Sequence, residues 1–170
     1  MSGWLVLARR FLVVAALLFW QGGFTFYAGG VVPGGQDVLG SQLRQGFITR
    51  QVTYYLNLAG AAALLILLLD LLVVGREAPW VRRLRWLSWL AMLGILVALV
   101  WLHPHIDQYL NPETQELTNG RAFRAGHRLY LWLSTVQWVF GFVYLGLTLW
   151  AWRETDRLRE SMNQHRPEDG

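Results

Sequence analysis

The sequence predicts an all-α integral membrane protein, a bundle of four transmembrane helices. Hydrophobic residues make up 54% of the 170 residues and charged residues only 15%, whereas soluble domains carry about 25% charged residues. Four long apolar runs are present, and about 20 apolar residues in a helix cross a hydrocarbon core about 30 Å thick. The ten tryptophans and six tyrosines fit a protein whose aromatic rings lie at two membrane–water interfaces.

The predicted helices lie within one bundle domain, residues 1–152, at residues 11–33, 52–75, 86–102 and 129–152. Three are long enough to cross outright, and the third, the shortest, needs the turns on either side. The first run follows Arg9 and Arg10 like the core of a signal peptide, but its apolar stretch is longer than such cores usually are. We therefore expect a retained helix. The polar residues 153–170 form a predicted cytoplasmic tail that continues the fourth helix before fraying.

The arginines predict the orientation of the bundle. Ten lie beside one end of the predicted helices and five beside the other: Arg9, Arg10, Arg76, Arg82, Arg83, Arg85, Arg153, Arg157, Arg159 and Arg166, against Arg44, Arg50, Arg121, Arg124 and Arg128. Because positively charged residues favour the cytoplasmic side, we expect a multi-pass protein of a bacterial cytoplasmic (inner) membrane with both termini inside. Residues 36–51, whose apolar side chains recur at helical spacing, are predicted to form a short helix on the outer interface.

The sequence contains no motif for catalysis or cofactor binding. With no cysteine it has no thiolate metal site and no cysteine nucleophile, and it lacks H-E-x-x-H, P-loop, G-x-G-x-x-G and G-x-S-x-G patterns. We therefore expect no enzyme, no cofactor and no metal. The arginines flank apolar runs instead of lining one stripe, so the predicted partner is the lipid bilayer and not nucleic acid. A second membrane subunit or a second copy of the chain is the other partner considered.

Four polar side chains lie inside the apolar runs: Gln21, Asn57, Asp70 and Gln137. Gln21 and Gln137 fall near the bilayer midplane, where a buried amide needs partners. We expect both to face the interior and to bond each other across the first and fourth helices, or to bond Ser134, Thr135 or a backbone carbonyl. A polar path for a solute or proton is the alternative. Asp70 lies near the cytoplasmic end of the second helix, and we expect it to pair with the arginines at 82–85 or with Ser88. The alternative for Asp70 is a proton or cation relay.

A polar cluster is predicted at the outer ends of the helices. Phe123 and His127 are four residues apart and should share one helix face, at the level of His103 and Asn57. We expect His127 to donate to or accept from the second or third helix and so lock the helix ends together. Contact with a ligand or metal is the alternative, in which Arg124 would favour an anionic group. His103 and His105 flank Pro104 and should point to opposite sides, away from one shared ion.

Three spaced elements carry a family resemblance: residues 20–33 with their glycine-rich centre and Val32-Pro33 exit, Pro104-x-Ile106, and Phe123-Arg124-x-x-His127. Together they resemble a family of small four-helix membrane proteins of unknown function, which includes bacterial members and the animal transmembrane protein linked to cisplatin resistance. The resemblance implies the four-helix fold and makes Phe123, Arg124 and His127 candidate site residues. It implies no activity. The sequence departs from the family pattern at Arg128, where a small residue is expected after the histidine. It also departs at the two histidines that flank Pro104.

Three functions are compatible with these features. The first is an accessory or scaffold subunit or a small oligomer, because packing features abound and no catalytic constellation is found. The second is a small transporter or metal-handling protein, based on Asp70, the histidines and the resemblance. Only three methionines are present, whereas copper handling favours methionine-rich or histidine-rich clusters. The third is a haem- or quinone-binding redox module, although no helix centre contains a histidine.

Overall fold

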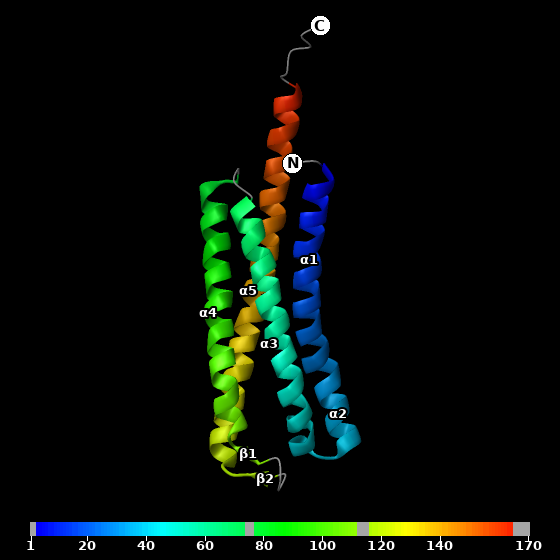
Figure 1. The fold of residues 1–170 in the computed structure, drawn as a ribbon, viewed down its shortest axis with the longest axis vertical. Helices are drawn as coiled ribbons and strands as arrows, with labels where there is room; N and C mark the ends of the chain where they lie inside the picture. The colour runs from blue at the N-terminus through cyan, green and yellow to red at the C-terminus, as the bar shows by residue number, and fades with distance from the viewer. Residues whose placement is uncertain (1–2, 74–76, 112–115, 165–170) are drawn as a thin grey trace.

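The computed structural model describes residues 3–73, 77–111 and 116–164, and in these ranges the chain forms an elongated helical bundle (Figure 1). Its elements are α1 (Gly3–Phe26), the π-helix η1 (Tyr27–Val31), α2 (Val32–Leu39), α3 (Gln42–Val73), α4 (Pro79–Asp107), β1 (Leu110–Asn111), β2 (Glu116–Leu117) and α5 (Gly120–Gln164). The ranges Gly3–Leu39, Leu43–Val73, Pro79–Asp107 and Gly120–Met162 are each long and apolar enough to cross a membrane. The predicted all-α four-helix membrane bundle is confirmed.

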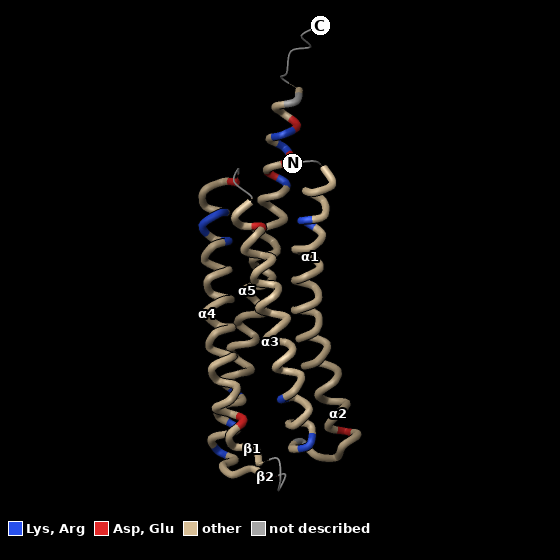
Figure 2. Tube along the Cα trace, in the orientation of Figure 1, with Lys and Arg blue, Asp and Glu red and all other residues tan. Residues whose placement is uncertain are grey.

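Both termini lie at one end of the bundle, which we call the terminal end, and the α2–α3 turn and the two strands lie at the other, the hairpin end (Figure 1). α3 packs between α1 and α4, and α4 packs along α5, whereas α1 and α5 meet at few points. Figure 2 shows charged residues gathered toward the two ends and an uncharged middle. This distribution is the one that a membrane-crossing bundle requires, because charges avoid the hydrocarbon core.

The first rod is longer than predicted and contains a π turn. Pro33 lacks an N–H and its ring crowds the carbonyl four residues earlier. The backbone widens just before it, and the Val32 N–H donates to the Tyr27 carbonyl, five residues back. The wider turn lets the helix continue past the proline. The helix ends at Gly40, whose φ of 58° is a left-handed conformation suited to glycine. The predicted separate helix over residues 36–51 is therefore wrong, because those residues divide between α2 and α3.

The other helices also run past their apolar segments. α3 begins at Gln42, and α4 spans Pro79–Asp107, where 86–102 was predicted. α5 begins at Gly120, where the Asn119 side chain caps it by accepting from the Ala122 N–H at 3.1 Å. The predicted continuation of the fourth helix into the polar tail is confirmed as far as Gln164, and residues 165–170 lie outside the described ranges. Apolar runs mark the membrane-crossing part of a helix and not its ends.

The interior is packed by large side chains against glycines. A shared core is formed by residues of all four rods: Val13, Leu17, Leu64, Leu67, Leu71, Met92, Leu96 and Tyr144. Gly60 supports the Trp20 indole so closely that a Cβ there would lie 2.8 Å from the ring. Such contacts are how helices associate in lipid, where apolar burial alone provides no preference. Phe19, Val97 and other large apolar side chains remain exposed on the outside, the surface that faces lipid.

Candidate functional site

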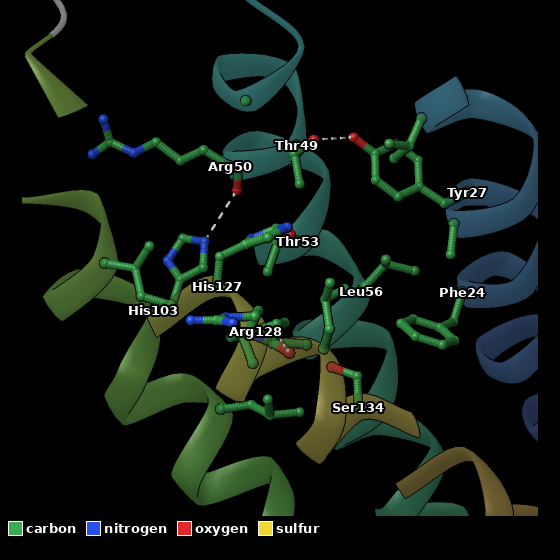
Figure 3. Close-up of a pocket in the computed structure, with 18 of the residues that line it drawn as sticks. Phe24, Tyr27, Thr49, Arg50, Thr53, Leu56, His103, His127, Arg128 and Ser134 are labelled. Carbon is green, nitrogen blue, oxygen red and sulfur yellow. Dashed lines mark hydrogen bonds between the residues drawn. The ribbon is translucent and has the colours of Figure 1, made fainter. Parts of the chain in front are cut away.

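A cavity of about 810 Å³ occupies the hairpin half of the bundle. Every helix contributes to its wall, and Figure 3 shows side chains of α4 and α5 reaching toward α3 across it. Its lining combines apolar surface with many polar side chains. The polar and charged lining residues are Gln21, Tyr27, Gln36, Gln45, Thr49, Arg50, Thr53, Asn57, His103, Asp107, Arg124, His127, Arg128, Tyr130, Ser134 and Gln137.

The structure brings the predicted outer cluster together in this cavity. His127, His103, Phe123, Arg124 and Asn57 all line it. The two deep amides, Gln21 and Gln137, line it as well. Asp70 does not, because it lies at the terminal end. His105 is also outside the lining, and its Nδ1 lies 2.7 Å from the Trp101 carbonyl of its own helix, so the prediction that the two histidines of α4 point apart is confirmed.

His103 is held in place by an acid that the sequence reasoning missed. Its Nδ1 lies 3.2 Å from Asp107 Oδ2, one turn later on α4, and its Nε2 lies 3.3 Å from the Arg50 carbonyl oxygen of α3. The same Asp107 oxygen lies 2.9 Å from Arg50 Nε. The carboxylate is therefore already engaged by two basic groups. The i,i+4 spacing of residues 103 and 107 was a usable signal, but the helix was expected to end before Pro104.

His127 is in the cavity without a hydrogen bond. Its ring stacks on Phe123, with the centroids 6.0 Å apart and the planes 5° apart, so the predicted common face is confirmed. No hydrogen bond joins His127 to any residue that the structure describes, and the predicted lock to the second or third helix is wrong. The cavity lies where that partner was expected. The link between α5 and α3 is made one turn deeper, where the Tyr130 hydroxyl donates to Asn57 Oδ1 at 3.0 Å.

The cavity wall carries more positive than negative charge. Arg50, Arg124 and Arg128 line it, and Asp107 is the one acid among the lining residues of the described chain. Arg50 is paired with that acid. Arg124 and Arg128, one turn apart on α5, form no ion pair with any described residue. Figure 3 shows Arg128 beside the cavity, on the same helix as Ser134. As far as the described residues go, these two guanidinium groups have no anionic partner.

The deep end of the cavity is bounded by amides. Gln21 and Gln137 are 8% and 5% exposed, so both face the interior as predicted. Gln137 Nε2 donates to the Met92 carbonyl at 3.0 Å, which confirms its predicted backbone partner. Gln21 packs against Gly141, and its Nε2 has no acceptor among the described residues. The expected Gln21–Gln137 bond is not formed, because Gln21 meets the glycine one turn away.

Tyr27 of η1 forms part of the opposite wall. Its hydroxyl donates to Thr49 Oγ1 at 2.9 Å and accepts from Gln45 Nε2 at 3.4 Å (Figure 3). Gln45 is 2% exposed, and its Oε1 has no donor among the described residues. Sequence reasoning missed these residues because Gln45 and Thr49 were assigned to a helix lying on the membrane surface. As part of α3 they face the bundle interior instead.

The cavity is partly open, and some of its lining residues are exposed. They include Ala28 of η1, Leu131 of α5, and Arg124 and Arg128 nearer the hairpin end of α5. Deeper in the bundle the Trp138 indole N–H donates to Thr25 Oγ1 at 2.9 Å and joins α5 to α1.

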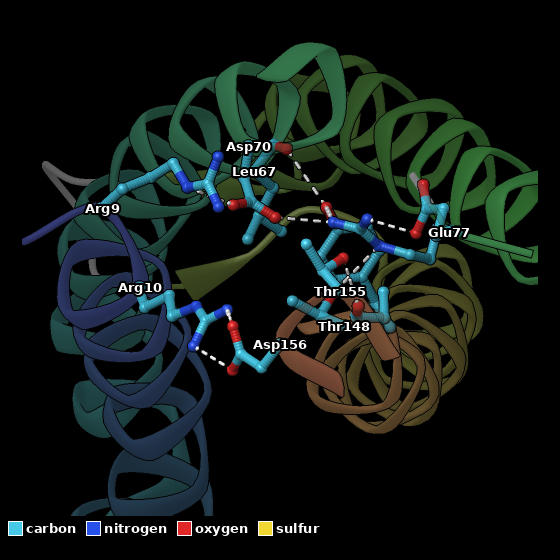
Figure 4. Close-up of polar contacts among 11 residues, drawn as sticks. Arg9, Arg10, Leu67, Asp70, Glu77, Thr148, Thr155 and Asp156 are labelled. Carbon is cyan, nitrogen blue, oxygen red and sulfur yellow. Dashed lines mark hydrogen bonds and ion pairs between the residues drawn. The ribbon is translucent and has the colours of Figure 1, made fainter. Parts of the chain in front are cut away.

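A second polar site, the terminal-end network, closes the other half of the bundle (Figure 4). Arg85 and Asp70, both 0% exposed, pair through Arg85 Nη2 and Asp70 Oδ2 at 2.6 Å. Arg85 Nη1 also pairs with Glu77 Oε2 at 2.7 Å, and its Nε donates to Thr148 Oγ1 at 3.2 Å. Arg9 of α1 places its Nε 3.1 Å from Asp70 Oδ1. The predicted pairing of Asp70 with the arginines at 82–85 is confirmed.

The terminal-end network connects all four rods. Tyr144 of α5 donates to the Leu67 carbonyl of α3 at 3.1 Å, and the Arg85 guanidinium lies 5.4 Å from the Tyr144 ring centroid. Nearby, Arg10 makes two hydrogen bonds to Asp156, at 2.8 and 2.7 Å. Within the network the buried acids Asp70 and Glu77 meet Arg9 and Arg85, so its charges balance. The network leaves the cavity no path through this end.

Known proteins give no further guide to either site. No family model, curated protein or solved structure matches the chain. Among the described residues, no group of three or more histidines, aspartates and glutamates is placed to hold a metal ion. The chemistry of the cavity therefore has to be inferred from its own residues.

Proposed function

We propose that the protein is a non-catalytic membrane protein that binds an amphipathic small molecule in the hairpin-end cavity. The observation that carries the proposal is a large, partly open cavity inside a membrane bundle, whose wall combines apolar surface with hydrogen-bonding side chains. Its volume of about 810 Å³ lies within the roughly 300–1,000 Å³ of sites for small ligands. A packing scaffold alone has no need for such a space, because helices in lipid gain from close contact.

The walls suit a molecule with a polar and an apolar part. Trp20, Phe24 and Leu131 supply apolar surface, and Asn57, Tyr130 and Ser134 supply hydrogen-bonding groups. An amphiphile of the bilayer already has its headgroup at the interface and its chain in the hydrocarbon core. It could enter between Ala28 and Leu131 in that same orientation. Its headgroup would then stay at the interface, so little desolvation of the headgroup would oppose binding.

The protein would act in a bacterial cytoplasmic membrane, with both termini in the cytoplasm and the cavity facing the outer leaflet. An accessory role, in which the bound molecule is held for a partner subunit, fits a cavity closed at the terminal end.

A cavity-filling substitution with a matched control tests the proposal. Gly46 lines the cavity, and a Cβ there meets nothing within 4 Å. Gly94, on the exposed side of α4 and outside the cavity, is equally open. Native mass spectrometry of purified protein should show a retained amphiphile in the wild type and in Gly94→Phe, and lose it in Gly46→Phe. Retention by Gly46→Phe, or no retained amphiphile in any of the three, contradicts the proposal.

A further inference from the structure

We infer that the ligand carries a small oxyanion headgroup, such as a phosphate monoester, held by Arg124 and Arg128 beside His127, with its chain leaving between Ala28 and Leu131. The inference rests on the proposed function and names the ligand class of the same cavity. It depends on the cationic rim, whereas the proposed function depends on the cavity and its opening. The two can therefore fail separately.

The rim presents three unengaged polar groups on one helix face. Residues 124, 127 and 128 are spaced i, i+3 and i+4 on α5, the spacing that places side chains next to one another. All three line the cavity, and none has a hydrogen bond or an ion pair to a described residue. Arginine presents a planar fork of donors that matches two oxygens of a phosphate or carboxylate. A neutral imidazole adds one further donor.

The charge balance of the wall favours an anionic ligand. Three arginines line the cavity against one carboxylate among the described lining residues. Asp107 is 2.9 Å from Arg50 and 3.2 Å from His103, so it is already engaged. Arg124 and Arg128 are exposed, so a bound headgroup displaces part of their water, and an anion replaces that water with charge-assisted hydrogen bonds. A neutral or cationic headgroup cannot supply that charge.

The position of the rim also fixes the direction of the ligand. Leu131 follows Arg128 by three residues, about 4.5 Å of helix rise toward the centre of the bundle. Leu131 of α5 and Ala28 of η1 are exposed residues of the cavity lining, and the inference places the opening for the chain between them. A headgroup at the two arginines therefore places its first chain carbons at the opening. The chain then runs from the interface toward the bilayer centre, parallel to the lipids around it.

Equilibrium binding to the full chain in phosphatidylcholine nanodiscs tests the inference. The probes are tritiated oleoyl lysophosphatidic acid, monooleoylglycerol with the same chain and no charge, and glycerol 3-phosphate with the headgroup and no chain. We expect the lysophosphatidic acid to bind at least tenfold more tightly than either other probe. A charged hydrogen bond typically contributes tenfold or more to affinity, so Arg124→Gln and Arg128→Gln should each weaken its binding about tenfold.

Arg121→Gln is the matched control, because Arg121 is exposed on the first turn of the same helix and does not line the cavity. Its affinity should equal that of the wild type. Equal binding of lysophosphatidic acid and monooleoylglycerol, or equal losses from Arg121→Gln and Arg124→Gln, overturns the oxyanion site and leaves the proposed function standing. Binding of glycerol 3-phosphate as tight as that of lysophosphatidic acid, or binding of no probe, overturns the proposed function itself.

Discussion

Replacing Asp70 by asparagine should destabilise the bundle far more than replacing Asp156, the more exposed acid that pairs with Arg10 at the same end. Asp70 and Arg85 are both 0% exposed and 2.6 Å apart. The substitution keeps the shape of the side chain but leaves Arg85 and Arg9 with one buried negative charge fewer. Removing one partner of a buried pair costs about 3–5 kcal/mol. Because Glu77 still pairs with Arg85, we expect a loss near the lower limit, about 3 kcal/mol.

Asp156→Asn is the matched control for Asp70→Asn. The Asp156 side chain is 43% exposed and pairs with Arg10, which is 22% exposed, and exposed pairs contribute about 0–1 kcal/mol. Free energies of unfolding would be measured by titrating each variant from dodecyl maltoside into sodium dodecyl sulfate micelles. Equal losses for the two variants would refute the reasoning that burial makes the Asp70 pair essential.

Three further predictions concern packing, hydrogen bonding and orientation. Gly60→Ala should lower the melting temperature, because its Cβ would lie 2.8 Å from a buried tryptophan ring and overpacking costs about 1–3 kcal/mol. The control Gly94→Ala, which has open space around it, should leave the melting temperature unchanged. Gln137→Leu should cost about 0.6–2 kcal/mol in the same unfolding titration, because it removes an interhelical bond to a backbone carbonyl; an unchanged value would mean that the bond contributes nothing. Cysteines placed at Gly34 and Asn119, which are both exposed at the hairpin end, should react with an impermeant thiol reagent in whole cells. Labelling only after lysis would contradict the predicted orientation.

The sequence predicts those features that depend on local spacing. The four membrane-crossing segments follow from run length, and the shared face of Phe123 and His127 follows from a separation of four residues. The pairing of Asp70 with Arg85 was also within reach, because both lie near one end of consecutive antiparallel helices. In each of these cases one helix, or one short link, determines the contact.

Contacts between helices far apart in the sequence were not predictable in this way. Arg9 reaches Asp70 because α1 packs beside α3, and nothing in the local pattern specifies which helices are neighbours. Gln21 contacts Gly141 instead of Gln137 for the same reason, because a shift of one helical turn along the axis of α5 changes the residue that it meets. The ends of the helices were placed too early because proline and polar residues were taken as stops, whereas η1 accommodates Pro33 and α4 continues through Pro104.

The most direct test of the account is to find where a bound amphiphile lies. Lysophosphatidic acid with a diazirine near the headgroup end of its chain would be equilibrated with the protein in nanodiscs, photolysed, and mapped by peptide mass spectrometry. We predict labelling concentrated on the residues that flank the opening, Ala28 and Leu131, and on Trp138 beside it, and reduced by Gly46→Phe but not by Gly94→Phe. Labelling spread evenly over lipid-facing residues such as Leu65 and Phe142, and unchanged in Gly46→Phe, would contradict a ligand site in the cavity.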